Sequence, residues 1–205
     1  MQSYLRESDE KKADIVNSFL YDEFYSKYTT DYCYYNDLST QVKGIDVSFV
    51  YNNKKYLCDE KAAVNWCNVP LETYAFEICS FNRGGKFQLG WLLNDDNKND
   101  SYMLVWLNKT DKNELTSKGE IREADIMIMD KSKLRQHMDS IGWTKENLLA
   151  QAELMRNNPY MDTINIPKQN VQLRCSSQLI ENPVNIRLKK SVLASMADCY
   201  YRIKA

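Results

Sequence analysis

The chain has 205 residues, of which 43% are hydrophobic and 27% charged, so it can bury the core of one compact domain. Its net charge of −1 argues against a general nucleic-acid coat protein, which would carry a basic excess, and leaves any nucleic-acid contact to a local patch. No stretch approaches the roughly 20 apolar residues that cross a bilayer, and the charged N-terminus lacks an apolar signal core. We therefore expect a cytoplasmic protein with no membrane partner.

The cysteines and the histidine exclude further classes of site. Six cysteines are scattered without a CxxC pair, and the single histidine, His137, lies in a polar helical stretch. A zinc site and a His-based triad therefore lack ligands, and the chain is not short or secreted-looking enough for a disulfide framework. We expect reduced thiols in or near the core.

The first two thirds of the chain combine one helix with several strands. Apolar residues recur at spacings of three and four over residues 9–28, which predicts an amphipathic helix. Runs of β-branched and aromatic residues then predict strands at 32–35, 45–51, 55–63, 73–81, 86–93, 102–108 and 121–129. This order predicts an α/β domain with a mixed central sheet flanked by helices.

The last third has a different pattern. Helical periodicity returns at 131–141, 144–157 and 191–202, with short candidate strands at 170–175 and 184–188. We therefore expect a single domain over 1–205, with a core at about 10–130 and a helical C-terminal portion at about 131–205.

One predicted hairpin gathers charged residues. Two asparagines at positions 52 and 53 separate two of the strands and suit a two-residue turn, because Asn tolerates positive φ. In that register Asp46 lies directly opposite Asp59, with Cβ atoms about 4.5–5.5 Å apart on one face. Lys61 follows two residues later and shares that face, because strand side chains alternate.

Two adjacent carboxylates repel each other unless a cation compensates their charge. Mg²⁺ suits this role, because it binds oxygen ligands through one or two carboxylates together with water and substrate phosphate. The nearby Lys61 could stabilise charge that develops on a phosphate or orient an attacking water.

The sequence contains an Asp, twelve further residues and then Asp-Glu-Lys, on strands predicted to pair. This pattern resembles the PD-(D/E)xK nuclease superfamily, which has the restriction-endonuclease-like fold. The resemblance covers about residues 10–130. It implies that Asp46 and Asp59 bind Mg²⁺ or Mn²⁺ and that Lys61 assists attack on a phosphodiester. A preceding helix often contributes another acid in this family, and Glu23 is the candidate by position.

Two more acids complete the candidate site. Glu60 points away from the shared face, but its backbone carbonyl could join the metal shell. Glu77 lies in an apolar strand, where a buried charge needs a partner or a metal, so it is a further candidate ligand. The proline that usually precedes the first Asp of the family pattern is replaced by Ile45.

The resemblance implies a metal-dependent nuclease whose partner is nucleic acid, with DNA as the first expectation. A homodimer would suit double-strand cutting, which in a small domain often needs two sites. Two alternatives remain open at this point. One is a catalytically inactive binding or assembly module on the same fold. The other is an unrelated α/β scaffold in which Lys61 forms an ordinary salt bridge with Asp46 or Asp59.

Overall fold

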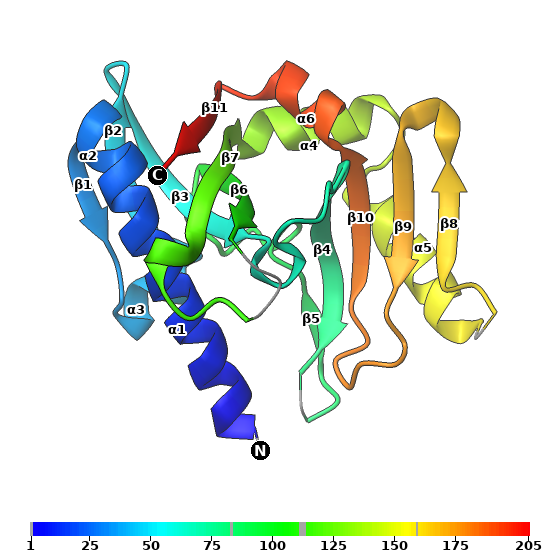
Figure 1. The fold of residues 1–205 in the computed structure, drawn as a ribbon. Helices are drawn as coiled ribbons and strands as arrows, with labels where there is room; N and C mark the ends of the chain where they lie inside the picture. The colour runs from blue at the N-terminus through cyan, green and yellow to red at the C-terminus, as the bar shows by residue number, and fades with distance from the viewer. Residues whose placement is uncertain (1, 83, 111–113, 159) are drawn as a thin grey trace. The chain divides into compact units, whose positions relative to one another are not determined.

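The computed structural model describes residues 2–82, 84–110, 114–158 and 160–205, apart from the side chains of residues 2–10 and 38 (Figure 1). The chain forms two compact units, and each unit is built from segments that are separate in the sequence. Unit 1 consists of Met1–Leu71, Asn99–Asp130 and Ala197–Ala205. Unit 2 consists of Glu72–Lys98 and Lys131–Met196.

Unit 1 contains a six-stranded sheet in the order β1-β2-β3-β6-β7-β11. Neighbouring strands are antiparallel except β3 and β6, which are parallel. A parallel pair requires a crossover, and here the chain passes through a segment of unit 2 between the two strands. The strands are β1 (Thr30–Tyr34), β2 (Val47–Tyr51), β3 (Lys54–Ala62), β6 (Ser101–Lys109), β7 (Ile121–Asp130) and β11 (Cys199–Lys204).

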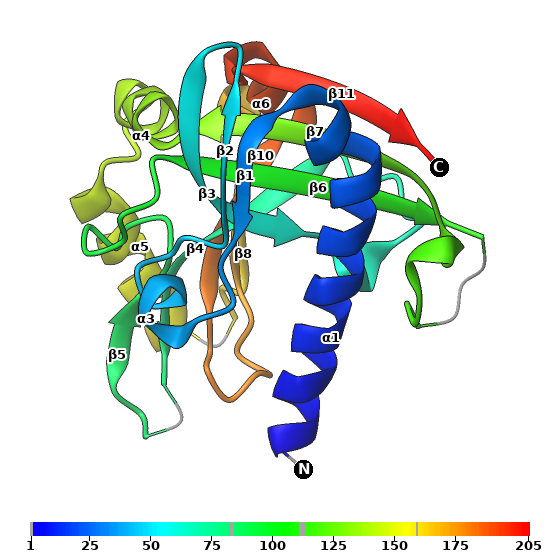
Figure 2. The ribbon, with the colours of Figure 1, turned by 90° about the vertical axis from the view of Figure 1, so that its left-hand side faces the viewer.

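One face of this sheet is covered by the N-terminal helical segment. The segment comprises α1 (Gln2–Leu20), a π-helical turn η1 (Tyr21–Tyr25) and α2 (Ser26–Tyr28), so the helix begins before the expected residue 9. Figure 2 shows α1 running across β6 and β7. Its predicted apolar stripe packs into the sheet core, because Val16, Phe19, Leu20 and Phe24 are buried there. Shorter elements of unit 1 are α3 (Leu38–Gln41), η2 (Val64–Trp66) and η3 (Lys118–Glu120).

Unit 2 has its own five-stranded antiparallel sheet in the order β5-β4-β10-β9-β8. The strands are β4 (Thr73–Phe81), β5 (Phe87–Leu89), β8 (Thr163–Ile166), β9 (Val171–Cys175) and β10 (Val184–Lys189). The helical elements are α4 (Lys131–Ser140), α5 (Lys145–Asn157), η4 (Pro167–Gln169) and α6 (Lys190–Met196). Thr144 caps α5 by accepting a hydrogen bond from the Asn147 backbone at 3.3 Å.

The expectation of one central sheet with a helical C-terminal third is wrong. Helices and strands are mixed as in an α/β protein, but they build two sheets, and the last third contributes strands β8 to β11 as well as helices. The expected helix at 191–202 ends at Met196, and β11 follows it. The reason is the alternation of Cys199, Tyr201 and Ile203, which pack on the unit 1 core, with outward residues between them.

Among the helices that the structure describes, none combines the length and the apolar character needed to cross a membrane.

Candidate metal-binding hairpin

Strands β2 and β3 form the predicted hairpin, and their register is confirmed. Tyr51 pairs with Lys54, and the turn residues Asn52 and Asn53 have φ values of 48° and 60°. Positive φ at both central positions is what a two-residue type I′ turn requires, and it matches the right-handed twist of the strands. The turn therefore fixes which residues of the two strands lie opposite each other.

Asp46 and Asp59 lie across the hairpin from each other. The described pairing ends at Val47 and Cys58, and Asp46 lies in a bend just before β2, with its backbone nitrogen donating to the Cys58 carbonyl at 2.9 Å. The carboxyl groups of Asp46 and Asp59 nevertheless meet, because a hydrogen bond between them contributes to the raised pKa of Asp59. Val47 and Cys58 are buried in the core under α1. By alternation along β3, Asp59 and Lys61 belong to the opposite face of the sheet, where the Asp46 side chain contacts Asp59.

The three residues are joined by short contacts. The Lys61 ammonium lies 2.5 Å from Asp59 Oδ1. The Glu60 backbone nitrogen donates to Asp46 Oδ2 at 2.8 Å, which holds the Asp46 carboxylate against β3. Asp59 is 2% exposed, whereas Asp46 and Lys61 are half-buried. The Asp59 carboxylate is therefore held almost out of water beside one cation and one further carboxylate.

Burial raises the pKa of Asp59 to about 7. The Lys61 ammonium opposes this rise, and the neighbouring Asp46 carboxylate adds to it by repulsion and by hydrogen bonding. The raised pKa means that burial disfavours the charged form of Asp59. A bound cation would stabilise that charged form and lower the pKa again.

The Glu60 side chain occupies the other face of β3, as predicted. Its Oε2 accepts a hydrogen bond of 2.8 Å from the hydroxyl of Tyr25, which is fully buried at the end of the π-helical turn. Burial raises the pKa of Glu60 to about 7, and the hydrogen bond from Tyr25 and the nearby Asn17 amide partly offset the rise. Neither Tyr25 nor Asn17 was predicted from the sequence to lie near Glu60. The π-helical turn that positions Tyr25 has no simple sequence pattern, and such turns frequently occur at functional sites.

Glu23 is directed elsewhere. It forms an ion pair with Lys27, one helical turn further along the same segment. Such an i,i+4 ion pair on a helix surface balances the charge of the Glu23 carboxylate without a metal. The N-terminal segment therefore reaches β3 through the phenol of Tyr25, and Glu23 has no described contact with Asp46, Asp59 or Lys61.

Glu77 belongs to unit 2. It lies on β4 opposite Asn185 of β10, and its Oε1 accepts a hydrogen bond of 3.3 Å from Ser80. The backbone around it is tightly packed, because a Cβ at Gly90 would lie 2.3 Å from the Glu77 carbonyl oxygen. Gly90 is thus required for the close approach of the chain after β5 to β4.

The hairpin can supply part of a metal shell. In the described part of the chain, no group of three or more His, Cys, Asp and Glu side chains is gathered for a metal. Asp46 and Asp59 nevertheless offer two carboxylates, one of them disfavoured in its charged form, and this donor set fits Mg²⁺ or Mn²⁺ bound largely through water and phosphate. Glu60 contacts Asp46 through its backbone nitrogen, and ligation by its carbonyl stays a prediction.

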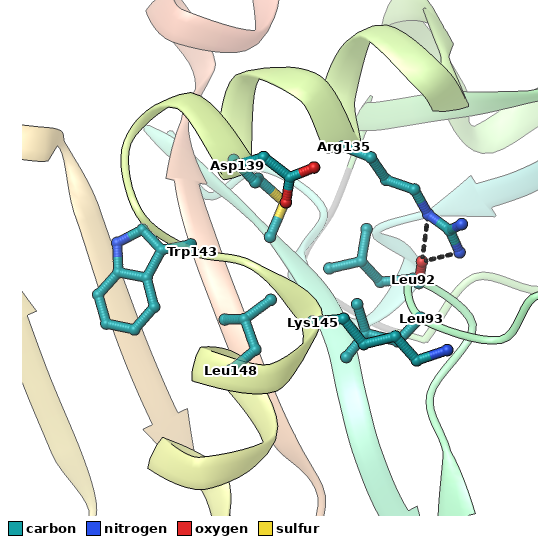
Figure 3. Close-up of a pocket in the computed structure, with 8 residues that line it drawn as sticks. Leu92, Leu93, Arg135, Asp139, Trp143, Lys145 and Leu148 are labelled. Atoms are coloured by element: carbon teal, nitrogen blue, oxygen red, sulfur yellow. Dashed lines mark hydrogen bonds between the residues drawn. The ribbon is translucent and has the colours of Figure 1, made fainter.

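Unit 2 contains a small pocket of about 160 Å³ between α4, α5 and the turn after β5 (Figure 3). Leu92, Leu93 and Trp143 contribute apolar walls. Arg135 donates to the Leu92 carbonyl at 2.7 Å, and both Arg135 and Lys145 pair with Asp95, which lowers the pKa of Asp95 to about 2. A cavity of this size holds a group no larger than about one benzene ring, so it is a weaker candidate for the main site.

Comparison with protein-family models, with curated proteins and with solved structures found no match to this chain.

Proposed function

We propose that Asp46, Asp59 and Lys61 form the active site of a metal-dependent phosphodiesterase that acts on nucleic acid, with DNA as the first candidate substrate. The observation that supports this most is the direct juxtaposition of Asp46 with the buried Asp59, with Lys61 2.5 Å from Asp59. This spacing is the one that resembles the PD-(D/E)xK superfamily. We infer a cytoplasmic location and propose that two copies act together on a duplex.

Each residue has a distinct role in this proposal. When Mg²⁺ or Mn²⁺ is bound, it supplies Lewis-acid polarisation of the phosphate and lowers the pKa of a bound water. Asp46 and Asp59 hold the cation, and the backbone of Glu60 orients Asp46 by its hydrogen bond of 2.8 Å. Lys61, which is half-buried, can move its ammonium from Asp59 to an oxygen of the substrate phosphate.

A second candidate is a non-catalytic binding or assembly module. The Lys61–Asp59 ion pair favours it, because a cation that already balances a buried carboxylate can serve the fold alone. The two candidates differ in one respect that can be measured. A catalytic site must bind a divalent cation at Asp46 and Asp59, whereas a structural ion pair has no such requirement.

The deciding experiment is a crystal structure soaked in Mn²⁺, combined with cleavage assays on single- and double-stranded DNA and RNA. We expect an anomalous peak at about 2.0–2.3 Å from carboxylate oxygens of Asp46 and Asp59. Asp46→Asn, Asp59→Asn and Lys61→Met should each lower Mn²⁺-dependent cleavage by about a hundredfold or more. Glu23→Gln is the matched control and should retain activity, because Glu23 pairs within its own helix.

Two results would contradict the proposal. One is a confirmed metal-dependent cleavage that survives all three substitutions. The other is the absence of both cleavage and a Mn²⁺ peak, with Lys61 still paired to Asp59, which would favour the non-catalytic module.

A further inference from the structure

A larger cavity lies in unit 2, where the β4–β5 hairpin meets α5. Its volume is about 760 Å³, which is within the range of small-molecule sites. The end of β4, the start of β5, one side of α5 and the loop before β10 supply its walls, so all of them belong to the same unit (Figure 1). On the helix side, Leu149 and Ala150 make the wall apolar.

The hairpin holds two aromatic rings beside this cavity. Phe81 and Phe87 lie opposite each other on β4 and β5, with ring centroids 6.2 Å apart and ring planes at 77°. Asn82 braces the turn between them, because its Oδ1 accepts hydrogen bonds from the backbone nitrogens of Gly84 and Lys86 at 3.0 Å. Phe87 nevertheless remains 46% exposed. A ring that is exposed on a braced turn can stack on a ligand without first being uncovered.

Arg156 of α5 adds a third flat group to the wall. Its guanidinium carbon lies 4.5 Å from the centroid of the Phe81 ring and 5.8 Å from that of Phe87. The same guanidinium donates to the Asn182 carbonyl at 3.0 Å and to the Cys79 carbonyl at 3.1 Å, which fixes its plane. Guanidinium and aromatic groups both stack on planar rings, so this combination favours a planar aromatic ligand over an aliphatic one.

Two polar side chains of the cavity can bind the edge of such a ligand. The Oδ1 of Asn182 accepts a hydrogen bond of 3.0 Å from the Cys175 thiol, so the other end of the amide, Nδ2, is the donor that remains. Glu153 is an exposed residue of α5, and its carboxylate is an acceptor. Neither Nδ2 of Asn182 nor this carboxylate has a hydrogen-bond partner among the residues that the structure describes.

The charges that face the cavity favour a neutral ligand. Among its described lining residues, Arg156 and Glu153 are the charged ones, and their charges cancel. An anion would be repelled by Glu153 and a cation by Arg156. A neutral ring that carries donors on one part of its edge and acceptors on another meets no such repulsion.

We propose that this cavity binds a guanine base, either of a nucleoside or of a single-stranded nucleic acid. The N1 and N2 hydrogens of guanine can be donated to the Glu153 carboxylate, and its O6 and N7 can accept from Asn182. The purine ring can stack on Phe87 at the same time. This site does not rest on the proposed activity of the hairpin.

Isothermal titration calorimetry of the full chain with guanosine tests the proposal, in EDTA so that the metal-dependent cleavage proposed for the hairpin cannot interfere. Inosine lacks only the 2-amino group, whereas adenosine has no N1 hydrogen and carries an amine in place of O6. We expect inosine to bind about tenfold more weakly than guanosine and adenosine more weakly still, because each lost hydrogen bond to a charged group has about this effect.

The DNA trinucleotides TGT and TTT distinguish the two sources of the base. Tighter binding of TGT than of guanosine, with no binding of TTT, identifies a base within a single strand as the ligand. Tighter binding of guanosine than of TGT identifies the free nucleoside. Both results support a guanine site, whereas equal binding of TGT and TTT contradicts it.

Two substitutions probe the stacking and the edge contact separately. Phe87→Ala should raise the Kd of guanosine about tenfold, the effect of losing one stacked ring. Tyr160→Ala is its matched control, because Tyr160 is a 96% exposed aromatic residue of unit 2 that is not among the described lining residues. Glu153→Gln should reduce the preference for guanosine over inosine, and Glu146→Gln, at the start of the same helix, should preserve it.

Glu153→Gln keeps the test valid if Phe87→Ala fails to fold, because Glu153 is exposed on a helix. The proposal is overturned if guanosine does not bind, if adenosine binds as tightly as guanosine, or if the preference for guanosine over inosine is unchanged in Glu153→Gln. Loss of hairpin cleavage leaves these results unaffected, so the two proposals fail independently.

Discussion

At the scale of single residues, Asp59 and Glu60 make the stability of the protein depend on pH. Their carboxyl pKa values lie at about 7, whereas unfolded Asp and Glu titrate at about 4. Between these values the folded protein binds more protons than the unfolded chain. The free energy of unfolding should therefore fall as the pH rises from about 4 to about 7 and change little above that.

Urea denaturation at a series of pH values tests this dependence. Asp59→Asn and Glu60→Gln should each flatten the slope, because each variant removes one of the groups whose protonation differs between the folded and unfolded states. A slope that is the same in the wild type and in both variants would contradict this explanation.

The hydrogen bond between Tyr25 and Glu60 can be tested in the same way. Tyr25→Phe leaves a half-buried carboxylate without its phenol donor, so we expect a loss of about 1–3 kcal/mol in the free energy of unfolding. Tyr28→Phe makes the same chemical change at an exposed position of the same segment and should cost less than about 0.5 kcal/mol. Equal effects of the two substitutions would show that the hydrogen bond contributes nothing.

The residue scale also shows what the sequence could predict about the candidate site. The register of the β2–β3 hairpin was predictable, because a two-residue turn fixes it, and this register brings the Asp46 carboxyl group beside Asp59 although Asp46 itself lies just outside β2. The contact of Tyr25 with Glu60 was not, because it joins a helix to a strand 35 positions later and depends on a π-helical turn. Glu23 was chosen by position alone, and its pairing with Lys27 removed the support for that choice.

At the scale of elements, β11 is the clearest departure from expectation. Lys190–Met196 forms the helix α6, as predicted for this part of the segment. The prediction was wrong beyond Met196, where buried and exposed residues alternate as in a strand and do not recur every three or four positions. Tyr200 lies four residues after Met196 and so continued the helical spacing, but in β11 it is an exposed residue that points outward. Antiparallel pairing with β7 holds the segment as a strand. Arg202 and Asp125, which lie opposite each other in this pairing, form an ion pair at 2.7 Å.

The strand assignment predicts a contrast between neighbouring positions. Ile203 is buried in the core under α1 and Lys204 is exposed. Ile203→Ala should lower the free energy of unfolding by about 2–5 kcal/mol, whereas Lys204→Ala should change it by less than about 0.5 kcal/mol. Chemical denaturation measures both values. Comparable losses at the two positions would contradict the alternation.

At the scale of the whole molecule, two sheets replace the single sheet that was expected. Strand existence was mostly predictable, because β2, β3, β4, β6 and β7 are long and rich in β-branched or aromatic residues. Strand partners were not. Nothing local indicates that β3 pairs with β6 or β4 with β10, since these pairs join segments far apart in the chain.

The division into units predicts an unequal response to truncation. Removing residues 199–205 deletes β11. In unit 1, β7 then becomes an edge strand that pairs only with β6, while every strand of unit 2 remains. Hydrogen exchange followed by mass spectrometry should show lost protection in β7 and β6 and retained protection in β9 and β10. Uniform loss of protection over all strands would show that the two units unfold as one.

The order of strands also has a consequence for synthesis on the ribosome. β4 ends at Phe81, but its partner β10 begins at Val184, about a hundred residues later, which at about 5–20 residues per second is a delay of roughly 5–20 seconds. During this time one edge of β4 has no partner, and such an edge can pair with other nascent chains. We therefore expect the yield of native protein to depend on chaperones that shield emerging strands, more than for a fold whose strands pair in the order in which they are made.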